Sequence, residues 1–382
     1  MGLPMARALG ALTRRDSHLP APTGGLTGQD PRSNGPDGEI PHEYVESGDS
    51  TRDPDSHIKE DACSRFRVQL TPRQPRKNTL SAIGNTPLVR LNRVTKGMAA
   101  DVYMKLEYYN PTGSYKDRMA LAMIEGAERD GLLRKGDTVV EYTGGSTGSS
   151  LAFVCAVKGY KLKVVTSDAF SDEKLDTMKA FGAMLTIVPS GSGKTTPEII
   201  PKMMKVAEEM AREPHTYWTN QFYNKYMLAG YNALGVEILD QMGGRVDAFV
   251  ASFGTAGCSM GVAEVLKARN SDVKVCLVEP AESPVLSKGI KGTHDIEGIG
   301  AGFVPPLLRR ELYDEVLTVS TEEAKAMARR LAREEGIFAG SSSGANVLAA
   351  TRVGRELGAG KSVVTVAVDS GLKYLSTDLY GG

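Results

Sequence analysis

The sequence predicts an α/β protein with two three-layer αβα domains, mostly parallel sheets and a disordered N-terminal tail. From about Asn78 onward, short β-branched runs alternate with helical segments. This alternation is typical of parallel strands covered by helices on both faces. At roughly 100–200 residues per domain, a chain of 382 residues suits two domains. The first 76 residues lack the alternation and form the predicted tail.

The tail, residues 1–76, is rich in Gly, Pro and polar residues. Its few aliphatic side chains cannot offset the entropy of an ordered chain, so we expect disorder. The first 15 residues hold Arg7, Arg14 and Arg15 but no acidic residue, as in a weak mitochondrial presequence. No secretory signal is recognisable. We therefore expect a cytoplasmic protein and leave a mitochondrial location open.

The next segment, residues 77–222, is expected to form the N-terminal domain. Short runs rich in β-branched residues predict strands, and the longer segments between them predict helices. Strands are expected at 138–142, 162–166 and 185–188, and helices at 149–156, 172–181 and 197–212.

The last segment, residues 223–382, is expected to form the C-terminal domain and repeats the alternation. Its strands are expected at 246–252, 274–279, 315–319 and 362–368. Ligands of such folds bind at the carboxyl ends of the strands. The turns that follow strands are therefore where we expect the chemistry.

Charge and hydropathy exclude several classes of protein. The 46 Lys and Arg residues balance 46 Asp and Glu residues, whereas a general nucleic-acid binder usually carries a basic excess. No apolar run approaches the roughly 20 residues that span a bilayer. We expect a soluble protein without nucleic-acid or membrane partners.

The cysteines and histidines form no metal motif. Cys63, Cys155, Cys258 and Cys276 lie far apart, without a CxxC pair or a neighbouring His spacing. We interpret them as mostly buried small hydrophobic residues in a reducing compartment and expect no metal site.

Three turns suit anionic ligands. In 252–261 a strand runs into small residues and then a helix, so backbone N–H groups can converge on a phosphate, although small residues also serve tight packing. The segment 141–150 could hold a carboxylate or simply cap a helix. In 110–119 Lys116 opens a predicted helix after a Pro/Gly break. A lone lysine is usually a solvated charge. Lys116 is a candidate functional residue only because the other two turns, which suit anions, follow it in the chain.

One further motif is rejected. Residues 191–196 resemble the end of a Walker A loop, but Val188 stands where that motif needs glycine. We expect a surface loop there.

Seven segments of the chain are informative when they are taken together. They are 83–91, 110–118, 220–222, 279–286, 298–305, 342–346 and 369–377. They resemble the cysteine synthase (O-acetylserine sulfhydrylase) and cystathionine β-synthase family of pyridoxal-phosphate (PLP) enzymes. Each segment alone is modestly specific for this family, but all seven in the family's order are very specific. The resemblance covers about 78–379 and implies the tryptophan synthase β-like fold (fold type II), with the first segment of the N-terminal domain crossing to the other domain.

The resemblance implies a role for each site residue. Lys116 would form the Schiff base with PLP, Ser146 would stand at the cofactor's phenolic oxygen, and Ser342 would face its pyridine nitrogen. The phosphate would bind the turn of Gly254, Thr255, Ala256, Gly257, Cys258 and Ser259. The substrate carboxylate would bind Thr143, Gly144, Thr147 and Gln221.

The implied reaction is β-replacement. Lys116 would remove the Cα proton, a leaving group on Cβ would depart to give an aminoacrylate, and a nucleophile such as sulfide would add. A neutral hydroxyl at the pyridine nitrogen makes the ring a weaker electron sink than an aspartate would, which favours β-elimination or β-replacement over transamination. A homodimer is also implied.

Several positions depart from the family's usual residues. Ser146 replaces an asparagine, which predicts a water-mediated or unpaired phenolic oxygen. Gly144 replaces a serine, which predicts extra room and one donor fewer at the carboxylate. Ala256 and Cys258 stand where the family prefers Gly and Thr, so Ser259 or Thr255 is expected to replace the missing donor.

Three functions are compatible with these residues. The leading hypothesis is an enzyme of cysteine biosynthesis that makes cysteine or a related β-substituted alanine from an activated serine such as O-acetylserine. The second is cystathionine or diaminopropionate synthesis, or β-elimination of serine, threonine or cysteine. The third is a non-catalytic relative, against which the presence of Lys116 argues.

Overall fold

The computed structural model describes residues 75–191 and 198–381. The predicted disordered tail lies outside the described residues except for its last two positions, and so do Cys63 and most of the rejected Walker-like segment. Chain contacts separate residues 1–72 from residues 73–382, and only the second unit is described here.

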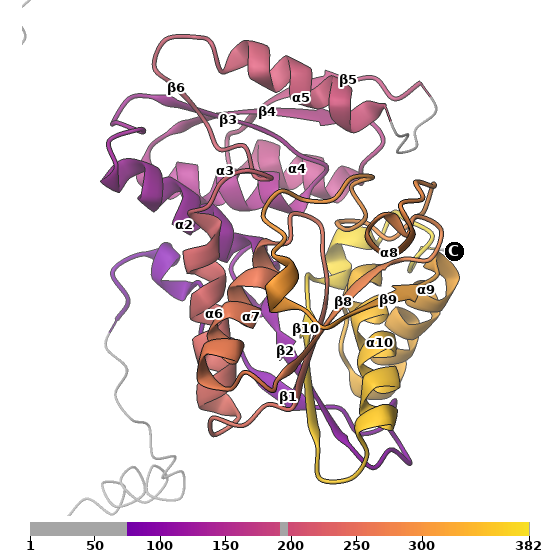
Figure 1. The fold of residues 1–382 in the computed structure, drawn as a ribbon. Coiled ribbons are helices and arrows are strands. Elements are labelled where there is room, and N and C mark those ends of the chain that lie inside the picture. Colours follow the sequence, from indigo (N-terminus) through magenta and orange to yellow (C-terminus); the bar gives the residue numbers. More distant parts are fainter. Residues whose placement is uncertain (1–74, 192–197, 382) are drawn as a thin grey trace, which may run out of the picture. The chain divides into compact units, whose positions relative to one another are not determined.

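Two sheets organise this unit (Figure 1). The larger has six strands in the order β1-β2-β10-β7-β8-β9, and the smaller has four in the order β5-β4-β3-β6. All neighbouring strands run parallel except β1 and β2. The strands are β1 (Leu88–Arg90), β2 (Asp101–Leu106), β3 (Thr138–Tyr142), β4 (Lys161–Ser167), β5 (Met184–Val188), β6 (Thr216–Trp218), β7 (Ala248–Ser252), β8 (Lys274–Pro280), β9 (Glu315–Val319) and β10 (Ser362–Ala367).

Helices cover both faces of each sheet. In the smaller sheet, α5 packs on β3 and β4, while α3 and α4 pack on the other face. In the larger sheet, α9 and α10 lie on one face and α6 and α7 on the other. The helices are α2 (Lys116–Arg129), α3 (Ser146–Lys158), α4 (Asp172–Ala180), α5 (Ile199–Met210), α6 (Met227–Gln241), α7 (Gly257–Arg269), α8 (Val285–Lys288), α9 (Thr321–Arg330) and α10 (Ser341–Leu357).

The predicted fold class is confirmed. The expected strands 138–142 and 315–319 match β3 and β9, and the other expected elements differ from the observed ones by a few residues at their ends. The sequence reasoning missed β1, β2 and β6. The division of the chain into domains at 77–222 and 223–382 stays a prediction. β1 and β2 come from the start of the first range, but they belong to the larger sheet, whose other strands come from the second range.

Helix α2 joins the two halves of the unit. It packs against α3 of the smaller sheet and against α6, which covers the larger one. Met119, Met123 and Ile124 on this helix are fully buried. Each such side chain contributes about 1.5–3 kcal/mol of hydrophobic stabilisation. The amino end of α2 is therefore held firmly between the sheets.

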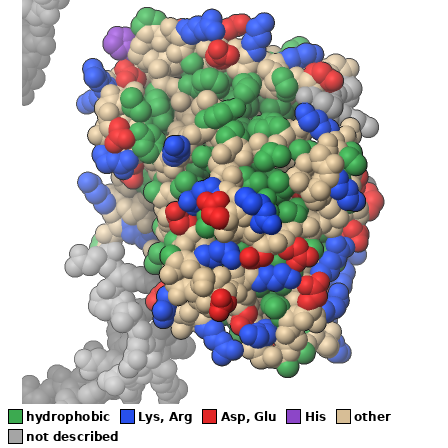
Figure 2. All heavy atoms as spheres, viewed as in Figure 1, with side chains coloured by type: hydrophobic (Ala, Val, Ile, Leu, Met, Phe, Trp, Pro, Cys, Tyr) green, Lys and Arg blue, Asp and Glu red, His purple; other side chains and the backbone are tan. Residues whose placement is uncertain are grey.

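The surface differs between the two halves. Figure 2 shows hydrophobic side chains gathered over the part of this face where the smaller sheet lies, and more charged side chains below it. Every helix among residues 75–191 and 198–381 is too short or too polar to span a lipid bilayer.

Candidate active site

Lys116 is the first residue of α2 and is buried. The loop before it is fixed by Asp117, whose carboxylate accepts hydrogen bonds from Thr112 N (2.8 Å) and Thr112 Oγ1 (2.6 Å). Burial lowers the pKa of the Lys116 amine to about 8, while the neighbouring Cys258 and Asp369 act in the opposite direction. Lys116 is therefore a desolvated amine that loses its proton far more readily than a surface lysine.

The turn after β7 leads into the amino end of α7. The first helical hydrogen bond of α7 runs from Met260 N to Ala256 O at 2.9 Å, so the N–H groups just before Met260 have no partner within the helix. Ala256 has a positive φ of 64°, a conformation in which glycine costs less. A Cβ atom on Gly254 would lie 2.5 Å from the backbone oxygen of Gly298. These features make the turn a compact, electropositive cradle suited to a phosphate.

The side chains of this turn are engaged with the protein itself. Ser259 Oγ donates to Ala256 O at 3.3 Å, and Thr255 Oγ1 donates to Met227 Sδ at 3.6 Å. Burial raises the pKa of the Cys258 thiol. That Ser259 or Thr255 replaces the family's threonine as a phosphate donor stays a prediction, and the backbone N–H groups at the amino end of α7 are further candidate donors.

The turn after β3 brings Thr147 and Gln221 together. Thr147 Oγ1 donates to Gln221 Oε1 at 2.8 Å, and Gln221 Nε2 donates to Tyr142 O at 2.9 Å. Thr143 Oγ1 accepts a hydrogen bond from Gly145 N at 3.1 Å. Three of the four residues predicted to bind the substrate carboxylate, Thr143, Thr147 and Gln221, are thus buried and held in fixed positions.

Glu141 supports this turn, a role that the sequence reasoning missed. Its fully buried carboxylate accepts hydrogen bonds from Thr219 Oγ1 (2.6 Å), Gln221 N (3.0 Å) and Tyr142 N (2.9 Å). Burial raises the pKa of Glu141 to about 7. A glutamate near the end of an otherwise largely apolar, buried strand is unusual. This feature of the sequence could have indicated the role of Glu141.

Gly144 does not leave extra room, and that prediction is wrong. A Cβ atom on Gly144 would lie 2.4 Å from Cε1 of Phe170. The phenyl ring from the segment after β4 occupies the space that a longer side chain at 144 would need.

Ser146 has a partner that was not foreseen. Its hydroxyl donates to Asp369 Oδ2 at 3.1 Å, and Tyr374 Oη donates to the same oxygen at 2.8 Å. Asp369 is buried. Asp369 is the first residue of the segment 369–377, and the sequence alone predicted no individual role for it.

Ser342 lies in the first turn of α10, and its Oγ is buried without a hydrogen-bond partner among the described residues. Such orphaned hydroxyls are uncommon in protein interiors. A ligand atom that accepts or donates a hydrogen bond would satisfy it.

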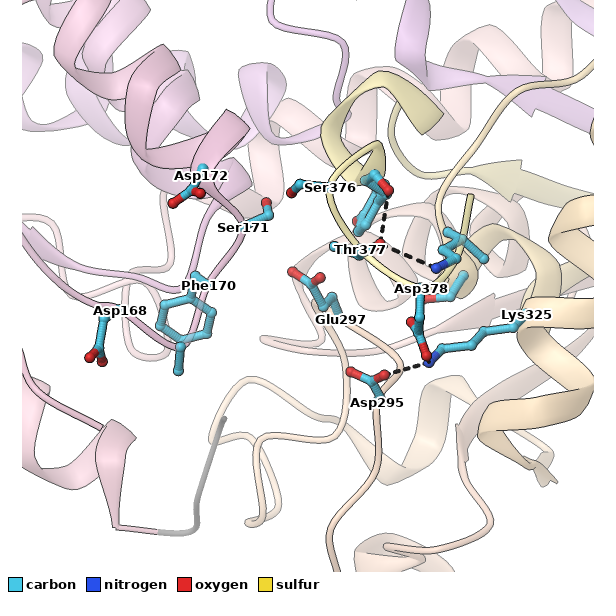
Figure 3. Close-up of a pocket in the computed structure, with 14 residues that line it drawn as sticks. Asp168, Phe170, Ser171, Asp172, Asp295, Glu297, Lys325, Ser376, Thr377 and Asp378 are labelled. Atoms are coloured by element: carbon cyan, nitrogen blue, oxygen red, sulfur yellow. Dashed lines mark hydrogen bonds and ion pairs between the residues drawn. The ribbon is translucent and has the colours of Figure 1, made fainter. Parts of the chain in front are cut away.

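An acidic pocket of about 300 Å³ lies beside this site (Figure 3). Tyr374, which contacts Asp369, forms part of its wall, as does Ser341. Among the described residues that line it, Lys325 is the only cation, and it pairs with Asp295 and Asp378. None of the residues predicted from the sequence lines this pocket. Its carboxylate-bearing lining residues are Asp168, Asp172, Asp295, Glu297 and Asp378.

No cluster of metal-ligating side chains occurs in the part of the chain that the structure describes. Cys155, Cys258 and Cys276 are buried free thiols, as predicted for them.

The residues present fit pyridoxal phosphate. The orphaned Ser342 hydroxyl suits the ring nitrogen, the α7 turn suits the phosphate, and Lys116 suits the aldehyde. A buried lysine in an α/β fold with two sheets, near a helix terminus suited to an anion, indicates the class of fold type II PLP enzymes.

Comparison with known proteins identifies the family. The model of the family described as "Pyridoxal-phosphate dependent enzyme" matches residues 79–369. The chain belongs to this family, and its cofactor is pyridoxal 5′-phosphate.

Similar proteins include two bacterial cysteine synthases. Cysteine synthase of Staphylococcus aureus (strain N315) is 46% identical over 310 residues, which cover 80% of this chain and 98% of that protein. The probable cysteine synthase of Bacillus subtilis (strain 168) is 43% identical over 308 residues, 79% of this chain and 97% of that protein.

Solved structures with the same fold include cysteine synthase from Entamoeba histolytica, with a TM-score of 0.76 and 38% identity over 81% of this chain and 92% of that one. O-ureido-L-serine synthase gives a TM-score of 0.75 and 36% identity over 81% and 96%. A hydrogen sulfide-producing enzyme from Fusobacterium nucleatum gives 0.74 and 37% over 79% and 100%.

Proposed function

We propose that the chain is a cysteine synthase-type enzyme that replaces the β-substituent of an activated serine, such as O-acetylserine, with sulfide to give cysteine. The observation that carries this proposal is the buried Lys116 amine with its lowered pKa, held opposite the α7 turn. The cysteine synthases to which the chain is 43–46% identical support the choice of reaction.

The chain's own residues would hold the cofactor at three points. Lys116 would bind the aldehyde, the N–H groups at the amino end of α7 would bind the phosphate, and Ser342 would meet the ring nitrogen. When bound, pyridoxal phosphate supplies an electron sink for the carbanion formed at Cα. A neutral hydroxyl at the ring nitrogen weakens that sink, which favours loss of a β-substituent.

Lys116 is suited to move the Cα proton. With a pKa of about 8, its nitrogen can accept a proton from Cα and return it to the product near neutral pH. Its burial keeps bulk water from competing for that proton. The substrate carboxylate would meet the hydroxyl groups of Thr143 and Thr147 and the amide of Gln221.

A second candidate is supported by Ser146 and Gly144, where the chain departs from the family's usual residues. Cystathionine or diaminopropionate synthesis, or β-elimination from serine, threonine or cysteine, would use the same lysine with a different leaving group or nucleophile. The relatives named as O-ureido-L-serine synthase and as a hydrogen sulfide-producing enzyme indicate that this scaffold serves several such reactions.

The experiment is a product assay on the purified enzyme loaded with pyridoxal phosphate. O-acetylserine, O-phosphoserine, serine and cysteine are each supplied with and without sulfide, and cysteine, pyruvate and sulfide are measured. Cysteine formed chiefly from O-acetylserine and sulfide supports the main proposal. Pyruvate or sulfide as the chief product supports the second candidate, and no product from any pair contradicts both. A homodimer and a cytoplasmic location belong to the same proposal.

A further inference from the structure

Asp369 lies where three parts of the site meet. An isolated β-bridge pairs it with Ser114, and Tyr115 N donates to Val368 O at 3.0 Å, so Asp369 is fixed beside the segment that carries Lys116. Gly340 N donates to Asp369 O at 3.1 Å, which fixes it to the amino end of α10. The position of this carboxylate is therefore set by backbone contacts as well as by its side chain.

The two oxygens of the carboxylate differ. Oδ2 accepts the Ser146 hydroxyl at 3.1 Å and the Tyr374 phenol at 2.8 Å. Oδ1 is buried and has no hydrogen-bond partner among the described residues. Oδ2 therefore already accepts two hydrogens, whereas Oδ1 keeps its lone pairs for a further donor.

The Ser146 hydroxyl therefore has no second hydrogen to donate. A serine hydroxyl carries one hydrogen, and here it points to Asp369. Toward any other neighbour, Ser146 presents only lone pairs. In the family, an asparagine at this position offers an N–H to the cofactor's phenolic oxygen. Ser146 offers no donor there, because its hydroxyl is hydrogen-bonded to the Asp369 carboxylate.

We propose that Asp369 is a positioning residue that withdraws the Ser146 hydroxyl from the cofactor and supplies the negative charge that keeps a proton on the Lys116 nitrogen. This inference rests on the proposed function only as far as cofactor binding at Lys116. The assignment is consistent with the direction of the charge effect, because Asp369 raises the pKa of Lys116 against the larger effect of burial.

Other charged groups surround Asp369. Lys373 is the nearby cation that would compete with Lys116 for the Asp369 carboxylate. However, its Nζ has no hydrogen-bond partner among the described residues, and burial lowers its pKa. The titratable groups on the elements around Asp369 are Tyr115, Lys116, Cys258, Lys373, Tyr374 and Tyr380, with Asp117, Lys174 and Glu297 one contact further away.

The test is a pH titration of the visible absorption band of the bound cofactor, in the holoenzyme without substrate. This band reports protonation of the nitrogen that joins Lys116 to the cofactor. In Asp369→Asn the midpoint is expected to fall by roughly one pH unit or more, because a nearby opposite charge is lost. Ser146→Ala keeps the carboxylate and removes only its longer hydrogen bond, at 3.1 Å, so its midpoint should rise slightly rather than fall.

Two further variants complete the test. Asp378→Asn is the matched control, because it removes an exposed carboxylate of the same C-terminal segment, and it should leave the midpoint unchanged. Tyr374→Phe removes one donor from Asp369 Oδ2 and should raise the midpoint. This second variant keeps the proposal falsifiable if Asp369→Asn does not fold.

An unchanged midpoint in Asp369→Asn, or a shift of the same size in Asp378→Asn, would overturn the proposal. If Asp369→Asn cannot be produced, an unchanged or lower midpoint in Tyr374→Phe would do so. A wild-type protein without any cofactor band would instead defeat the proposed function, so the two failures are distinguishable.

Discussion

The phenyl ring of Phe170 occupies the space in front of Gly144, where a Cβ atom would lie 2.4 Å from Cε1 of the ring. The two residues come from the segments that follow β3 and β4, which are neighbouring strands of the smaller sheet. The shape of the substrate turn therefore depends on a residue outside that turn.

Restoring the family's serine at this position should reduce activity. Gly144→Ser forces the Phe170 ring to move, and overpacking of this kind costs about 1–3 kcal/mol. We expect a higher KM for the amino acid and a lower melting temperature. In the double variant Gly144→Ser with Phe170→Ala, both effects should diminish. Equal losses in the single and double variants would contradict the steric explanation.

Glu141 should make stability depend on pH. Its folded-state pKa is raised from 4.5 to about 7, so the folded state holds this proton more tightly than the unfolded state does. The contribution of Glu141 to the free energy of unfolding therefore falls as the pH rises from about 4.5 to about 7.

The variant Glu141→Gln tests this dependence. An amide nitrogen would face donors such as Gln221 N, and one unsatisfied buried donor costs about 1–3 kcal/mol. The difference in unfolding free energy between wild type and variant, measured by urea denaturation, should shrink as the pH rises through that window. A difference that is constant with pH would contradict the assignment.

Gly254 should be needed for cofactor affinity. In Gly254→Ala the new Cβ would lie 2.5 Å from Gly298 O, and this backbone atom cannot move aside as a flexible side chain would. We expect the Kd for pyridoxal phosphate to rise by about tenfold, equivalent to about 1.4 kcal/mol. In Gly257→Ala the neighbour at 2.4 Å is Met227 Sδ, on a flexible side chain, so the loss should be smaller. A larger rise in Kd for Gly257→Ala than for Gly254→Ala would contradict this steric explanation.

Cofactor uptake should follow the ionisation of Lys116. The neutral amine reacts with the aldehyde, and the pKa of Lys116 is lowered to about 8 by burial. The rate at which cofactor-free protein gains its visible band should therefore rise with pH and level off above about pH 8. A rate that continues to rise toward pH 10.5, the ordinary value for lysine, would indicate a solvated amine.

Local patterns were sufficient to predict most of the fold. Buried parallel strands read as β-branched runs, and β3 and β9 were located to the residue. By contrast, β1 and β6 have only three residues each, too few for a periodic pattern. β2 contains the polar Asp101 and Lys105. Lys105 is buried with three hydrogen-bond acceptors, and two of them, Glu237 and Gln241, come from a distant segment of the chain.

The sequence predicted those site residues that lie within short, recognisable segments leading into helices. Lys116, Thr147 and Ser342 belong to such turns, and the structure buries all three. The roles of Asp369, Phe170 and Glu141 depend on contacts across the fold. Asp369 meets Ser146 across 223 positions of the chain, and no spacing rule reports such a contact.

The most direct test of the central claim is borohydride reduction of the holoenzyme, followed by peptide mapping. Reduction fixes pyridoxal phosphate on the amine that carries it. We predict a single labelled peptide, modified at Lys116, and no label in Lys116→Ala at equal cofactor concentration. A label on another lysine, or a wild-type protein that takes up none, would contradict the account.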